Sequence, residues 1–174
     1  QFMIKPKFAA CKRWLLLLFG VFLLGGCGEA GVRAAAAALP GIDVSSAAVL
    51  AEEDSHGGFH GDGTAFLCFD CSGTDIADQI AGSESWTPFP LDDTVRTLVY
   101  GIEDETVKMG PYLSDEDGEP RIPEIEKGYY FLTDRQAEEG KAAGADLLHR
   151  ASLNFTLGIY DSDTDILYYF EMDT

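Results

Sequence analysis

The stretch Leu153–Met172, which reads LNFTLGIYDSDTDILYYFEM, decides the fold of this chain. Large apolar residues at Leu153, Phe155, Leu157 and Ile159 alternate with polar or small residues. Successive side chains of a strand point to opposite faces of a sheet, so this alternation predicts a half-buried strand with one face in water. The DSDTD segment predicts a turn, and the apolar and aromatic run after it predicts the antiparallel partner strand.

The segments upstream supply the other elements of the expected fold. Thr64–Cys71 (TAFLCFDC) is apolar at nearly every position, which is typical of a central strand buried on both faces. Tyr129–Thr133 (YYFLT) predicts another strand, and Ser72 and Asp92 are placed to start two short helices. We therefore expect an α+β fold, with a single antiparallel sheet of about four or five strands and short helices on one face.

Length and composition narrow the function classes. The chain has 174 residues, and its 12 Lys and Arg against 30 Asp and Glu give a formal charge of -18. The length suits one domain with a short extension, and 46% hydrophobic residues exclude a wholly disordered chain. Nucleic-acid binding requires clustered Lys and Arg, so we expect no nucleic-acid partner.

The first residues have the organisation of an export signal. Four basic residues and no acidic one precede the apolar run Trp14–Leu24, which is 11 residues long. A helix that spans a bilayer needs about 20 residues. The basic start, the short apolar run and the small residues after it favour a signal peptide over a membrane span.

The apolar run ends in Leu24-Gly25-Gly26-Cys27, which resembles the lipobox of bacterial prelipoproteins. The resemblance implies that the Cys27 thiol is joined to diacylglycerol and that the signal is cut just before it. Residues 28 to about 53 are rich in Ala and Gly, which predicts a tether. We therefore expect a signal peptide (1–26), a lipid-anchored Cys with a flexible tether (27–53) and one α+β domain (54–174). The location implied is the extracytoplasmic face of a cell membrane. The alternatives are a signal peptide cut elsewhere and a single retained membrane anchor.

Candidate ligand-binding residues gather before the first predicted strand, in Asp54–Gly63 (DSHGGFHGDG). Imidazole and carboxylate groups ligate zinc and similar ions, so His56, His60 and Asp62 form a hypothetical metal or ligand site. The alternative is a tight lead-in to the strand, with both imidazoles in structural hydrogen bonds. We expect no cofactor; the alternative is a divalent metal ion bound by these three residues.

Two further candidate sites are an aromatic side chain and a pair of cysteines. Tyr160 shares the polar face of its predicted strand with Asn154 and Thr156, so it is a candidate for stacking on a sugar or a peptide. Cys68 and Cys71 form a C-x-x-C pair that we expect to be two buried thiols on opposite faces of a strand. Cys71 precedes a predicted helix, which would suit a lowered pKa and a nucleophile with a His base.

Three function classes remain. The first is a membrane-anchored binding or interaction module, without catalysis, for a protein or carbohydrate at the cell envelope. The second is an envelope hydrolase that uses the 54–63 loop, with or without metal. The third is a structural or inhibitory lipoprotein. The segments HGGFHGDG and NFTLGIYDSDTD resemble small bacterial lipoproteins, a resemblance that implies no particular activity.

The lipobox makes a direct prediction. Labelled fatty acid should enter the wild-type protein and not Cys27→Ala, and the variant should leave the membrane fraction, because the diacylglyceryl group supplies the anchoring free energy. Labelling followed by membrane fractionation measures both effects. Equal labelling of the two proteins would exclude Cys27 as the lipid attachment site.

Overall fold

The computed structural model describes residues 34–35, 37–57, 61–137, 143–144 and 146–174. The elements in chain order are η1 (Val44–Ser46), β1 (Ala48–Asp54), β2 (Gly63–Asp70), α2 (Ile76–Gly82), β3 (Thr87–Pro88), α3 (Asp93–Tyr100), β4 (Ile102–Glu103), β5 (Lys108–Met109), β6 (Gly128–Asp134), η2 (Leu147–His149), β7 (Asn154–Asp161) and β8 (Ile166–Asp173).

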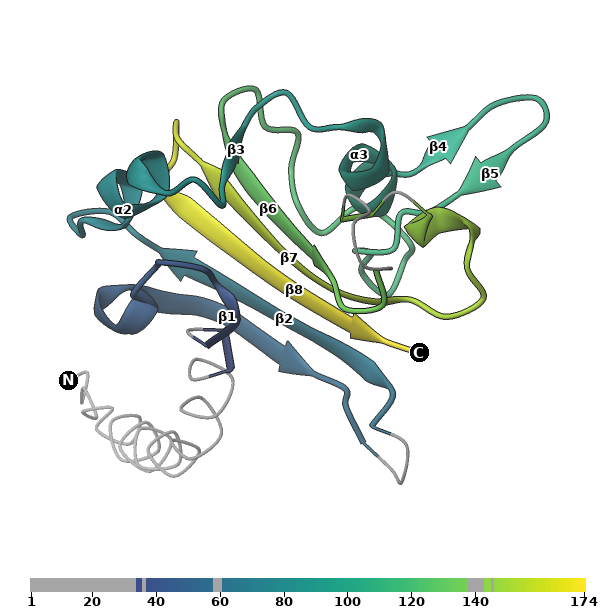
Figure 1. Cartoon of the computed structure of the whole chain (residues 1–174), viewed down its shortest axis with the longest axis horizontal. Coiled ribbons are helices and arrows are strands. Elements are labelled where there is room, and N and C mark those ends of the chain that lie inside the picture. Colours follow the sequence, from purple (N-terminus) through teal and green to yellow (C-terminus); the bar gives the residue numbers. More distant parts are fainter. Residues whose placement is uncertain (1–33, 36, 58–60, 138–142, 145) are drawn as a thin grey trace, which may run out of the picture.

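One antiparallel sheet organises these elements, in the order β1-β2-β8-β7-β6-β3 (Figure 1). The hairpin of β7 and β8 confirms the prediction for the carboxyl-terminal stretch, and it lies at the centre of the sheet. β2, second from one edge, also confirms its predicted strand. The sheet has six strands rather than four or five, and β4 and β5 form a separate small hairpin. The α+β class is therefore correct, and the expected sheet was too small.

Both faces of the sheet are covered. α2 packs on one face through Ile76 and Ile80, and α3 packs on the other through Val95, Leu98 and Val99. We call these the α2 face and the α3 face. The prediction that the helices share one face is wrong, because the central strands carry apolar side chains on both sides and each side needs its own cover.

β7 has no wet face, which corrects the expectation drawn from its alternating pattern. Thr156 is only 4% exposed and Tyr160 only 2%. A Cβ atom added at Gly158 would lie 2.7 Å from Cη2 of Trp86 and 2.9 Å from Cδ2 of Leu39. Gly158 therefore allows the segments that contain Leu39 and Trp86 to pack closely on β7, and this face of the strand is not in contact with water.

Residues 34–35 and 37–46 supply part of that cover. Ala35, Leu39, Ile42 and Val44 are at most 5% exposed, and Pro40 O accepts a 3.2 Å hydrogen bond from Trp86 Nε1. β1 follows as an edge strand. The predicted tether over 27–53 is therefore wrong from residue 34 onward, and the domain includes residues at least twenty positions before the expected boundary.

The predicted signal peptide and Cys27 lie outside the described residues. Among the residues from 34 onward that the structure does describe, no helix combines the length and the apolar character needed to cross a bilayer.

Two leucines test whether the amino-terminal segment is part of the domain. Leu39 is 3% exposed and Leu50 is 57% exposed. Leu39→Ala should lower the free energy of unfolding by about 2–5 kcal/mol, the range for a buried Leu truncation. Leu50→Ala should change it by less than about 0.5 kcal/mol. Urea denaturation measures both, and equal small effects would restore the tether interpretation.

Candidate functional site

A cleft of about 290 Å³ opens on the α2 face, where β1 and β8 both end. Its apolar floor consists of Ala65, Leu67 and Tyr169. Sheet register explains this composition, because Asp54 pairs with Ala65, which pairs with Glu171 on β8. Paired residues share a face, so carboxylates from the outer strand and the inner strand meet over one floor. We call this cavity the His56 cleft.

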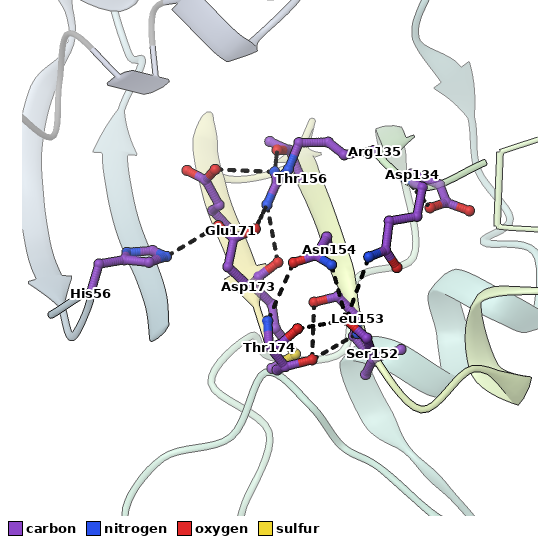
Figure 2. Close-up of polar contacts among 12 residues, drawn as sticks. His56, Asp134, Arg135, Ser152, Leu153, Asn154, Thr156, Glu171, Asp173 and Thr174 are labelled. Carbon is purple, nitrogen blue, oxygen red and sulfur yellow. Dashed lines mark hydrogen bonds and ion pairs between the residues drawn. The ribbon is translucent and has the colours of Figure 1, made fainter. Parts of the chain in front are cut away.

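His56 lies directly after β1, between two carboxylates. Its backbone N–H donates to Asp54 Oδ1 at 2.8 Å, and its ring Nδ1 lies 2.8 Å from the same oxygen. The bond from the His56 backbone N–H, with a smaller contribution from the ring, holds the pKa of the Asp54 carboxyl below its ordinary value. The ring Nε2 lies 3.3 Å from Asp173 Oδ2, in the geometry of an ion pair rather than a hydrogen bond (Figure 2).

The β8 carboxylates Glu171 and Asp173 form one wall of the cleft, and Arg135, which directly follows β6, holds this acidic wall in place. Its guanidinium donates to Thr156 Oγ1 and to Asp173 Oδ1, both at 2.5 Å, and lies 3.1 Å from Glu171 Oε1 (Figure 2). Tyr169 supports the same wall, because its hydroxyl donates to Glu171 Oε2 at 2.7 Å. Burial raises the pKa of Tyr169, so the phenol remains a donor. The two β8 carboxylates are thus held in place.

The charges around the cleft favour a cation. Apart from Glu53, which pairs with Arg121, Glu52, Asp54, Glu171 and Asp173 contribute four carboxylates, and among the described residues the Arg135 guanidinium pairs with Glu171 and Asp173. Among the described residues, Glu52 has no ion-pair partner. A half-buried negative wall over an apolar floor suits an ammonium or guanidinium group on an aliphatic stem.

The site expected from the sequence lies partly outside the described residues. His60 and Cys27 lie outside the described residues, and Asp62 is exposed. Among the described residues, the His56 ring contacts Asp54 and Asp173. A site formed with His60 and Asp62 remains a prediction. The described part of the chain contains no group of three His, Cys, Asp or Glu side chains placed to hold a metal ion.

Tyr160 is buried rather than on a strand face open to water. Its side chain is 2% exposed, and its hydroxyl donates to Asp165 Oδ1 at 2.5 Å, next to the β7–β8 turn. The His56 cleft adjoins Asp173, at the opposite end of the hairpin. About six residues of strand separate the two positions along β7, roughly 20 Å. The prediction of an exposed aromatic at Tyr160 is wrong because its strand face is covered.

The two thiols lie on opposite faces, as the strand alternation predicted. Cys71 is 3% exposed on the α2 face, and Cys68 packs half-buried on the α3 face. Burial raises the pKa of Cys71 to about 12, which is opposite to the lowered pKa that the alternative of a Cys71 nucleophile requires. His56 lies before β2 and Cys71 after it, so the strand separates the proposed base from the proposed nucleophile.

The residues that build the wall were missed in the sequence. Arg135, Glu171 and Asp173 come from the ends of β6 and β8, more than seventy residues after His56. One signal was present, since Tyr169, Glu171 and Asp173 alternate along β8 and so share a face. The pattern indicates that this face of β8 is apolar at first and becomes acidic toward the carboxyl end of the strand.

The raised pKa of Cys71 predicts low reactivity. At pH 8 about one thiol in ten thousand would be ionised, and the thiolate is the nucleophile. Iodoacetamide should therefore leave Cys71 of the native protein unmodified over minutes and modify it after unfolding in urea. Peptide mapping by mass spectrometry identifies the modified thiol. Native alkylation at the rate of a free cysteine would contradict the burial of Cys71.

The chain matches no protein-family model, no curated protein and no solved structure. The geometry of the His56 cleft is therefore the observation from which a function has to be inferred.

Proposed function

We propose that this protein is a lipid-anchored, extracytoplasmic binding module without catalysis, and that its His56 cleft holds a cationic group of the ligand. The observation that carries the proposal is the arrangement of four carboxylates around an apolar floor. An amine or a guanidinium on an aliphatic stem satisfies both features, because the stem covers the floor while the charge meets the carboxylates.

The rigidity of the wall supports binding. Glu171 is held by Arg135 and Tyr169, and Asp173 is held by Arg135. Side chains already fixed in the free protein lose little conformational entropy when a ligand binds. Glu52, without an ion-pair partner among the described residues, is the carboxylate available to the incoming charge.

The location follows from the amino-terminal pattern. A diacylglyceryl group at Cys27 would hold the domain at the membrane, while its acidic surface is repelled by anionic lipid. The domain would then face the envelope space with the His56 cleft accessible to a ligand there.

The alternative of an envelope hydrolase has weaker support. The bond between Asp54 and the His56 ring would orient a general base. The other ring nitrogen faces Asp173, so the position from which a base would take a proton already meets a carboxylate. This geometry favours a structural and electrostatic role for His56.

The proposal predicts weak binding of a single charged side chain. Nα-acetyl-lysine N-methylamide should shift amide resonances of the strands around the cleft, and its Nε-acetylated form should not, because acetylation removes the charge. Glu52→Gln should weaken the affinity about three- to fivefold, the value of an ion pair worth up to about 1 kcal/mol. NMR titration at low salt measures each affinity.

The matched control is Glu84→Gln, which removes the same charge from the exposed loop after α2. It should leave the affinity almost unchanged. If Glu84→Gln weakens binding as much as Glu52→Gln does, the attraction comes from overall net charge and the His56 cleft is not the site.

A further inference from the structure

The two edges of the sheet differ in their capacity to accept another strand. β3 is two residues long and contains Pro88, which has no backbone N–H to donate. β1 is seven residues long, and in the described part of the chain it pairs with β2 alone. A long edge strand with unpaired backbone groups is a template for a further strand.

The backbone of β1 presents these groups beside the His56 cleft. The Ser55 N–H donates to the Thr64 carbonyl at 2.8 Å, which marks the bonded position of the β1–β2 pair. Bonded and non-bonded positions alternate in an antiparallel pair. The N–H and C=O groups of Asp54 and Glu52 therefore point to the outer edge. A register irregularity between Val49 and Ala51 limits the regular edge to Ala51–Asp54.

Two clefts lie on opposite faces of this short edge. The His56 cleft is on the α2 face. On the α3 face, a cavity of about 550 Å³ is lined by Glu53, Phe66, Arg121 and the acidic loop 115–117. We call it the Arg121 cleft. Side chains of an added strand would alternate between the two faces, so two consecutive residues would reach the two clefts.

The Arg121 cleft already contains one cation from the chain itself. The Arg121 guanidinium lies 2.7 Å from Glu53 Oε2 and stacks over the Phe66 ring, 5.3 Å from its centroid. This contact shows that the α3 side of the edge accommodates a guanidinium between a carboxylate and an aromatic ring. Beyond Arg121, the carboxylates of Asp115, Glu116 and Asp117 leave the cleft acidic.

We propose that β1 binds an extended basic segment of a partner protein by strand addition, with two consecutive Lys or Arg side chains entering the His56 and Arg121 clefts. The proposal rests on the proposed function and names its ligand class. Charge complementarity selects the partner, because carboxylates surround the edge on both faces. A second copy of this chain is a poor occupant, since the acidic ends of two β1 strands would repel.

The first test uses a capped peptide, TVKRVT, and the same peptide with its three central backbone amides N-methylated. N-methylation keeps both charges and removes the donors that pair with an edge strand. By fluorescence anisotropy at low salt, the wild-type protein should bind the methylated peptide at least about tenfold more weakly. Equal affinity for the two peptides, or no binding of TVKRVT, overturns the proposal.

The second test changes the edge of the protein. Glu52→Ala and Glu52→Pro both remove the carboxylate, and only the proline removes the outward N–H, a change that edge strands tolerate. TVKRVT should bind Glu52→Pro at least about fivefold more weakly than Glu52→Ala, while Nα-acetyl-lysine N-methylamide should bind the two variants equally. Equal peptide binding by two folded variants contradicts strand addition.

The outcomes separate the two proposals. If the lysine derivative binds and the peptide results show no dependence on backbone amides, strand addition fails and the cationic cleft stands. If neither the derivative nor the peptide binds, both proposals fail. Circular dichroism melting of each variant establishes that the comparison is made between folded proteins.

Discussion

Pairing of β7 with β8 is the constraint on which the rest of the structure depends. The two strands pair from Asn154 opposite Asp173 to Asp161 opposite Ile166, at the centre of the sheet, and they are apolar on both faces. Each face therefore needs its own cover. α2 and α3 have only seven and eight residues, too few for stable isolated helices, so packing on this hairpin is what holds them.

Local patterns predicted the elements whose signals lie within a few residues. β7 follows from alternation, and β8 follows from the apolar and aromatic run after the turn. α3 follows from Asp92, whose side chain accepts from the Val95 N–H, and from Gly101 at a φ of 74°. The cover of the α2 face could not be predicted in this way. Position 158 requires a glycine because Trp86 and Leu39 approach its backbone closely. In the sequence, such a buried glycine cannot be distinguished from a small residue that faces water.

The candidate site shows the same division between local and distant information. His56 was identified from its own segment, and its partner Asp54 is two residues away. Asp173 and Arg135, which complete the wall, reach it through the pairing of β8 with β2 and of β6 with β7. A single sequence carries no record of which strands become neighbours, so the hypothetical site drawn from the sequence was limited to His56, His60 and Asp62 of one segment.

The boundary between core and cleft on the α2 face runs through Tyr169. Its side chain is 1% exposed within the core, while its hydroxyl binds Glu171 at the start of the acidic wall. Beyond that point four carboxylates lie around the cleft, the Arg135 guanidinium pairs with two of them, Glu171 and Asp173, and like charges at close range repel. Packing does not require this excess of negative charge, and a bound cation would offset the repulsion. This excess of carboxylates, which differs from the apolar packing of the rest of the sheet, is the feature on which the proposed binding of a cation rests.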